Sequence, residues 1–142
     1  MYQNNFKQLL IIDDDCCHNI ICALALKKLF RSSDVNMIGF TNSEEGMEHI
    51  MQSTRGTIEK TILFLDINMP RLSGWEILER LEQLPRAVKK QLEVYVITAS
   101  PNYYDEQKAL KSPLVKRYLE KPLSNHLHFI FEKRNMLQLS VA

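Results

Sequence analysis

The chain has 142 residues and a balanced charge, with 18 basic and 17 acidic residues and a formal net charge of +1 at pH 7. This length fits one domain, and a hydrophobic content of 45% can fill a core, which argues against a disordered chain. The even charge argues against a polybasic surface for nucleic acid or anionic membranes, and the apolar stretches are too short to span a bilayer. The first residues lack the basic-then-apolar design of a signal peptide, so a cytoplasmic protein is expected.

Short apolar runs alternate with amphipathic segments five times along the chain. Strands are expected at residues 9–12, 35–40, 62–65, 94–97 and 115–119, and the continuous apolar run at 62–65 is typical of a buried strand. The second run contains Asn36 and Gly39, which favours an edge position in a sheet. Strands separated by helical segments of this length predict right-handed crossovers, a mainly parallel sheet and a three-layer α/β sandwich.

Helical segments are predicted between the runs and after the last one. The second helix should end at about residue 52, the third should lie between Gly74 and Pro85, the fourth at about 102–111, and the last around 123–131. The first helix is predicted from a stripe at three-to-four spacing that should face the core, namely Cys17, Ile21, Leu24, Ala25 and Leu29.

Several conspicuous side chains have ordinary explanations. Three cysteines in a chain without an export signal are expected as buried or half-buried thiols, at Cys16, Cys17 and Cys22. The histidines share no metal-ligand spacing and are expected to be solvated or half-buried, at His18, His49, His126 and His128. Trp75 should pack at a helix start, and the pair Tyr103 and Tyr104 could serve a partner.

Polar residues follow four of the five predicted strands at the point where each strand ends. In chain order these residues are Asp13, Asp14, Asp15, Asp66, Thr98 and Lys121. Because the carboxyl ends of parallel strands meet at one edge of a sheet, these side chains are expected to lie close together.

Such a set of side chains suits metal-assisted phosphoryl transfer. Converging carboxylates repel one another unless a cation lies between them, and Mg²⁺ prefers a few carboxylates together with waters and phosphate oxygens. Asp66 could then attack phosphorus as a carboxylate nucleophile, while Lys121 and the Thr98 hydroxyl hold the phosphoryl oxygens. Each residue alone proves little, since Asp14 or Asp15 could simply cap the first helix. Their joint occurrence in this order favours the functional interpretation.

Four segments resemble the signature of response-regulator receiver domains: residues 10–15, residues 65–70 with Gly74 following, residues 97–99 and residues 120–122. The resemblance covers about residues 7–135 and is specific because all four parts are present. It implies a flavodoxin-like (βα)5 fold with a parallel five-stranded sheet of order 2-1-3-4-5. It also implies a single receiver domain over residues 1–142, and no output domain is expected.

The resemblance assigns roles to the strand-end residues. In that family, Mg²⁺ is held by three carboxylates and one backbone carbonyl, at the positions of Asp13, Asp14, Asp66 and Asn68. Asp66 is the expected phosphoacceptor, and Thr98 and Lys121 are expected to contact the phosphoryl group. The Lys121–Pro122 bond is usually cis in the family.

The resemblance also implies a switch and a set of partners. Phosphorylation should draw Thr98 inward, so that Tyr118 turns into the vacated space and remodels the face made by the fourth helix, the fifth strand and the last helix. A phosphohistidine of a sensor histidine kinase or a histidine phosphotransfer protein would donate to Asp66, and an unknown downstream protein would bind the remodelled face. The chain would thus be a signalling module of a two-component phosphorelay. It is not expected to be an enzyme, except that it would catalyse its own phosphoryl transfer and dephosphorylation.

Two other functions remain open. A pseudo-receiver would keep the fold as a binding scaffold without phosphorylation, but such proteins generally lack part of the acidic set or the lysine, and this chain has both. A Mg²⁺-dependent phosphatase with an aspartyl nucleophile usually has a second aspartate two residues further on, where this chain has Asn68.

Overall fold

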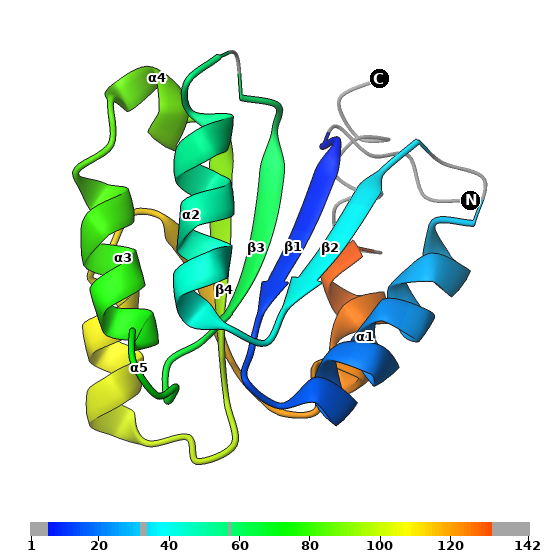
Figure 1. Ribbon diagram of the computed structural model, residues 1–142. Helices are drawn as coiled ribbons and strands as arrows, with labels where there is room; N and C mark the ends of the chain where they lie inside the picture. The colour runs from blue at the N-terminus through cyan, green and yellow to red at the C-terminus, as the bar shows by residue number, and fades with distance from the viewer. Residues whose placement is uncertain (1–5, 32–33, 57, 132–142) are drawn as a thin grey trace, which may run out of the picture.

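One parallel sheet forms the centre of the computed structural model, which describes residues 6–31, 34–56 and 58–131. Its strands are β1 (Gln8–Ile12), β2 (Asn36–Phe40), β3 (Thr61–Asp66), β4 (Leu92–Thr98) and β5 (Val115–Glu120), in the order β2-β1-β3-β4-β5 (Figure 1). Every neighbouring pair runs parallel. The predicted flavodoxin-like fold, the sheet order and the edge position of β2 are therefore confirmed.

The strands are connected by α1 (Cys16–Leu29), α2 (Ser43–Ser53), α3 (Gly74–Glu82), α4 (Arg86–Lys89) and α5 (Tyr103–Leu110). The fourth predicted helix corresponds to α5, because the four-residue α4 was not predicted: it is too short to show an apolar stripe. After β5, the 3₁₀ turn η1 (Leu123–Asn125) leads into helical residues 127–131. Among the described residues, no helix has the length and apolar character that a membrane span requires.

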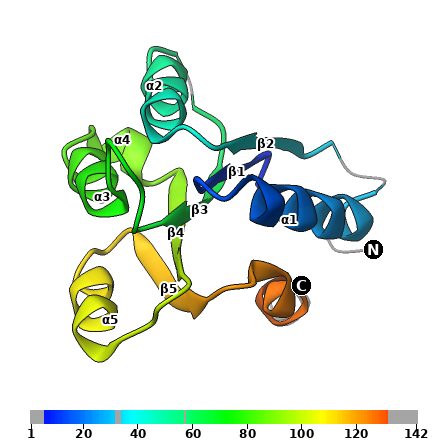
Figure 2. The ribbon, with the colours of Figure 1, turned by 60° about the horizontal axis from the view of Figure 1, so that its bottom comes forward.

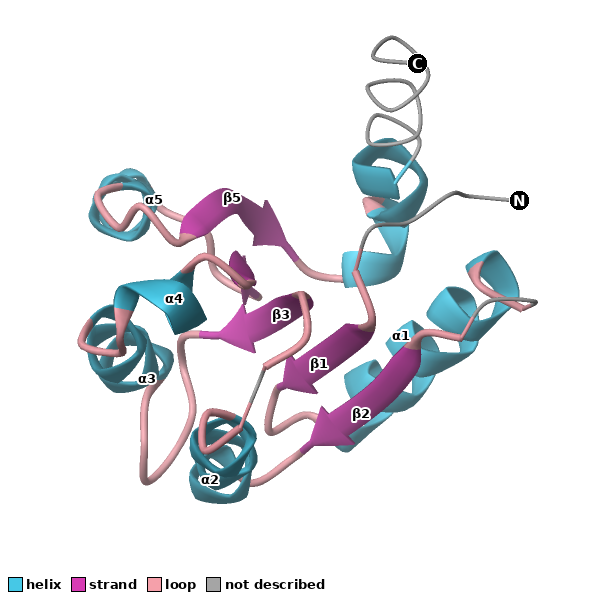
Figure 3. Cartoon of the chain, turned by 90° about the horizontal axis from the view of Figure 1, so that it is seen from above, coloured by secondary structure: helices cyan, strands magenta, loops and turns pink. Residues whose placement is uncertain are grey.

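The helices cover both faces of the sheet and make a three-layer sandwich. Figure 2 shows α1 and the C-terminal helical segment on one face and α2, α3 and α5 on the other, and Figure 3 shows the same layers from above. The core is split accordingly, since side chains alternate along a strand. Leu9 and Ile11 pack in the cluster that includes Leu26 of α1, while Leu10 and Ile12 pack in the cluster that includes Ile50 of α2.

The predicted buried face of α1 is partly wrong. Ile21 is 52% exposed, Leu24 is 65% exposed and Cys17 is also exposed, whereas the helix buries His18, Asn19, Cys22 and Leu26. The reason is that α1 carries apolar residues on most of its sides, so their spacing does not select one face. Of the three thiols expected to be at least half-buried, only Cys22 is, because Cys16 and Cys17 are exposed.

Candidate functional site

Three carboxylates meet at the carboxyl edge of the sheet, as their positions at strand ends predicted. Asp13 follows β1 directly, Asp66 is the last residue of β3, and one oxygen from each of Asp13, Asp14 and Asp66 lies within 4.8 Å of the others. Asp13 and Asp66 are buried, while Asp14 is exposed and opens the cluster to solvent. A cluster of hard oxygen ligands at this spacing could hold a metal ion.

The Lys121 side chain joins this cluster from the end of β5. Its Nζ donates to Asp13 Oδ1 at 3.0 Å and to Asp66 Oδ2 at 3.2 Å, and the side chain is only 14% exposed. Burial lowers the pKa of the ammonium group, but the hydrogen bonds and charges of Asp13 and Asp66 outweigh burial and raise the pKa above its usual value. Lys121 therefore stays positively charged between the two carboxylates.

The two buried carboxyl groups have opposite pKa shifts. Burial raises the pKa of Asp66 to about 6, against the lowering effects of the Asn68 N–H and of Lys121. Burial also acts to raise the pKa of Asp13, but hydrogen bonds from His18, the Asp15 N–H and Lys121 together lower it to about 2. At neutral pH both groups are ionised, and Asp66 is the more basic carboxylate of the pair.

The loop after Asp66 holds that residue against the start of α3. The Asn68 N–H donates to Asp66 Oδ1 at 3.1 Å, and the Gly74 N–H donates to the carbonyl of Ile67 at 3.1 Å. A Cβ atom at Gly74 would lie 2.3 Å from the Asp66 carbonyl oxygen, so only glycine permits this approach. Ser73 caps α3 by accepting the Glu76 N–H.

Thr98 and Tyr118 lie on the neighbouring strands β4 and β5, Thr98 at the end of its strand and Tyr118 two residues before the end of β5. Thr98 is fully buried at the end of β4, its Oγ1 accepts the Ser100 N–H at 3.1 Å, and its carbonyl accepts the Lys121 N–H at 2.8 Å. Tyr118 is half-buried on β5, and its hydroxyl accepts the N–H of Asn102, the N-cap residue of α5, at 3.2 Å. The Lys121–Pro122 bond is cis, as the resemblance implied.

Among the four histidines, His18 is the one whose burial was predicted wrongly. It is 7% exposed, and its Nδ1 lies 2.7 Å from Asp13 Oδ2. The hydrogen bond with Asp13 raises the pKa of the imidazole, against the lowering effect of burial. The geometry at Nε2 nevertheless requires the neutral form, because the Leu123 N–H donates to that nitrogen at 3.0 Å. The one signal in the sequence is its place in the first turn of a helix that begins just after a strand end, since helical side chains tilt toward the N-terminus.

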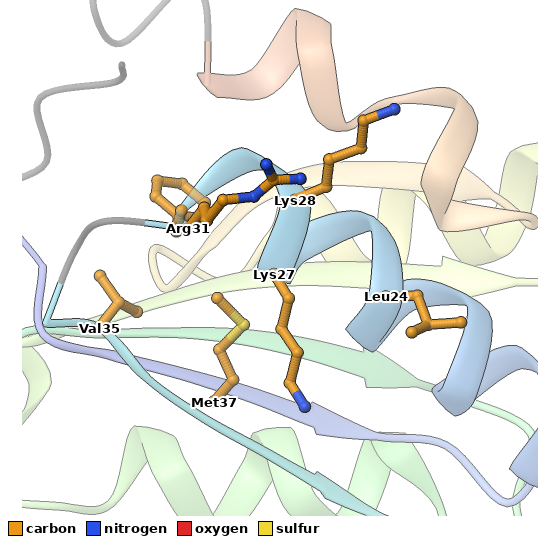
Figure 4. Close-up of a pocket in the computed structure, with 7 residues that line it drawn as sticks. Leu24, Lys27, Lys28, Arg31, Val35 and Met37 are labelled. Carbon is orange, nitrogen blue, oxygen red and sulfur yellow. The ribbon is translucent and has the colours of Figure 1, made fainter.

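Other candidate residues lie outside this cluster. His49 and His126 are half-buried and His128 is exposed, as predicted. Tyr103 and Tyr104 are exposed at the start of α5, and Trp75, in the first turn of α3, has the Lys108 Nζ 4.2 Å from its ring centroid. A pocket of about 560 Å³ lies between the last turns of α1 and the start of β2, away from the carboxyl edge, and Figure 4 shows its lysine and arginine lining.

Comparisons with known proteins agree with this fold. Residues 9–128 match the family model of the response regulator receiver domain. Among solved structures, a two-component response regulator from Cytophaga hutchinsonii has a TM-score of 0.76 and 24% identity, covering 92% of this chain and 97% of that chain. A receiver domain from Rhodospirillum rubrum has a TM-score of 0.72 and 18% identity, covering 95% and 94%. A receiver protein from Dyadobacter fermentans has a TM-score of 0.66 and 23% identity, covering 87% and 96%. No curated protein matched the chain.

The solved structures establish the likeness of the fold, and the family model matches most of the chain as a sequence. The chain therefore belongs to the family of response regulator receiver domains, the signalling modules of two-component systems.

Proposed function

We propose that this receiver domain accepts a phosphoryl group on Asp66 with the help of Mg²⁺ and thereby switches a partner-binding face. The observation that carries the proposal is the cluster of Asp13, Asp14 and Asp66, whose oxygens lie within 4.8 Å of one another, with the Lys121 ammonium 3.2 Å from Asp66 Oδ2. Carboxylates partly open to solvent are the ligands that Mg²⁺ takes alongside its waters, so the residues present fit this ion. The carbonyl of Asn68 is the proposed fourth protein ligand.

The transfer itself is a nucleophilic displacement at phosphorus. An Asp66 oxygen forms the new P–O bond while the P–N bond of a donor phosphohistidine breaks, and the leaving imidazole keeps the electron pair and takes up a proton. Mg²⁺, when bound, offsets the charge of the carboxylates and of the phosphoryl oxygens. Lys121 supplies a fixed positive charge beside Asp66. The Thr98 hydroxyl accepts the Ser100 N–H and can still donate its own hydrogen to a phosphoryl oxygen.

The proposed output runs through Tyr118. Its hydroxyl now accepts the Asn102 N–H, so a rotation of Tyr118 toward Thr98 would remove a hydrogen bond at the first turn of α5. That turn carries Tyr103 and Tyr104, which are 69% and 84% exposed and available to a downstream protein. The remodelled face would consist of α5, β5 and the helical segment after η1, a population shift between two states.

The proposed donor is a sensor histidine kinase or a histidine phosphotransfer protein. Helix α1 begins next to the carboxylate cluster and exposes three large apolar side chains, Ile20, Ile21 and Leu24. An apolar surface of this kind beside the reacting carboxylate suits a donor that must bring its phosphohistidine to Asp66.

The test is to incubate the protein with Mg²⁺ and acetyl phosphate and to measure the intact mass. The wild type should gain the mass of one phosphoryl group, and hydroxylamine should remove it because the product is an acyl phosphate. Asp66→Ala should gain nothing, whereas Asp34→Ala, which removes an exposed carboxylate, should behave as the wild type. An unmodified wild type would favour the pseudo-receiver, and an undiminished gain in Asp66→Ala would place the phosphoryl group elsewhere.

A further inference from the structure

His18 is a buried polar side chain with a partner at each ring nitrogen. It lies in the first turn of α1 and is 7% exposed. Its Nδ1 is 2.7 Å from Asp13 Oδ2, and its Nε2 accepts the backbone N–H of Leu123 at 3.0 Å. The side chain therefore bridges the end of β1 and the segment that follows β5.

The direction of these hydrogen bonds follows from the Leu123 N–H, which can only donate. Nε2 must then be unprotonated, so the neutral imidazole carries its hydrogen on Nδ1 and donates it to Asp13 Oδ2. A histidine that is fixed in one tautomer by one partner presents a defined donor to the other.

This donor fixes the orientation of the Asp13 carboxylate. With Oδ2 engaged by His18, Oδ1 is the oxygen that accepts the Asp15 N–H at 3.0 Å and the Lys121 Nζ at 3.0 Å. Rotation of the carboxyl group would break contacts at both oxygens at once. His18 thus leaves Oδ1 for the contact with Lys121, the cation that also contacts Asp66.

The second contact links the same side chain to Lys121. Leu123 is fully buried and begins η1, two residues after Lys121. The imidazole therefore ties the backbone that carries the lysine to the carboxylate that the lysine contacts. Asp13 and Lys121 are thus linked twice, through the His18 ring and through their own ion pair.

We propose that His18 is a positioning residue, which orients Asp13 for Mg²⁺ and holds the Lys121 segment against it; this inference rests on the Mg²⁺ site of the proposed function. Hydrogen-bonded partners of carboxylate ligands commonly have this role, and their removal typically weakens metal affinity by about 10–100-fold. The alternative is that His18 only supports core packing. Its Nε2 lies 3.5 Å from the Sγ of Cys22, and Cys22 belongs to the same hydrophobic core cluster as Leu26.

The experiment compares the Mg²⁺ affinity of unphosphorylated variants by calorimetric titration. His18→Leu keeps an apolar volume in the core and removes both hydrogen bonds, so it should weaken Mg²⁺ binding by about 10–100-fold. His18→Asn places an amide nitrogen where Nδ1 was and should recover most of the affinity. His18→Gln places its amide at the position of Nε2, within reach of the Leu123 N–H but not of Asp13, and should stay weak. His49→Leu removes a half-buried histidine that contacts Gln8 at the other end of β1, and should bind as the wild type.

The outcomes separate this inference from the function on which it rests. A wild type that does not bind Mg²⁺ would overturn the metal site and the positioning role together. A wild type that binds, with His18→Leu equally tight but less stable to urea, would overturn the positioning role alone. If His18→Leu does not fold, the difference between His18→Asn and His18→Gln decides, and equal affinities in those two variants would contradict the proposal.

Discussion

An Asp66→Asn substitution should stabilise the fold above pH 6, because it removes a buried carboxylate whose ionised form lowers the free energy of unfolding. Burial raises the pKa of Asp66 to about 6 in the folded chain, from 3.8 for the free group. Between those pH values the folded state binds a proton that the unfolded state has released, so the contribution of this group to stability is lost as the pH rises through 6. At about 1.4 kcal/mol per pKa unit, the shift corresponds to about 3 kcal/mol.

The magnitude should depend on pH in a defined way. At pH 4 the carboxyl group is protonated in the folded state and partly protonated in the unfolded state, so the variant should gain less than about 1 kcal/mol. At pH 8 the gain should approach about 3 kcal/mol, or about 10 °C in Tm for a chain of this size. Asparagine keeps an acceptor for the Asn68 N–H, and Lys121 keeps its contact with Asp13.

The assay is urea unfolding at pH 4 and pH 8 with EDTA present, followed by far-ultraviolet circular dichroism and Trp75 fluorescence. Asp34→Asn is the matched control, because the hydrogen bond from Lys7 lowers the pKa of Asp34 and its removal should not stabilise the fold at pH 8. A variant at Asp66 that is no more stable than the wild type at pH 8, or equally stabilised at both pH values, would refute the reasoning.

Two further substitutions test the surroundings of Asp66. Gly74→Ala should destabilise the fold by about 1–3 kcal/mol in urea titrations, because its Cβ would lie 2.3 Å from the Asp66 carbonyl oxygen; an unchanged midpoint would mean that α3 can shift freely. Tyr118→Phe should cost about 1 kcal/mol and speed amide hydrogen exchange in the first turn of α5, since the Asn102 N–H loses its acceptor. Exchange that stays as slow as in the wild type would show that this hydrogen bond does not anchor α5.

The strand ends were the most predictable part of the molecule. Buried parallel strands are continuous apolar runs, so the point at which a run meets a polar residue marks the edge of the sheet. That rule located Asp13, Asp66 and Thr98 correctly, because each lies at or directly after the end of a strand. Lys121 also directly follows a strand, but β5 is not a continuous apolar run, since it contains Lys116 and Arg117. Because all five strands are parallel, their carboxyl ends lie at one edge of the sheet, and the carboxylates and Lys121 meet there.

The buried face of α1 could not be predicted in the same way. The segment from Ile20 to Leu26 contains no charged or strongly polar residue, so no polar stripe marks the side of the helix that faces solvent. The orientation is set instead by tertiary hydrogen bonds: His18 bonds to the Asp13 side chain, and Asn19 Nδ2 donates to the Asp13 carbonyl at 2.6 Å. Ile21 and Leu24 are left exposed, because turning them inward would break both contacts.

The position of Lys121 has a kinetic consequence for metal exchange. Its Nζ lies 3.0 Å from Asp13 Oδ1 and 3.2 Å from Asp66 Oδ2, so the carboxylate cluster already contains a tethered cation. A divalent ion that binds here therefore meets carboxylates whose negative charge Lys121 already offsets in part. Its electrostatic binding energy is smaller than it would be at the three carboxylates without the lysine. Weaker retention shortens the residence time of the ion, since affinity differences fall mostly on dissociation. At the Mg²⁺ site that we propose, the covalently attached charge thus favours release of the ion over tight retention.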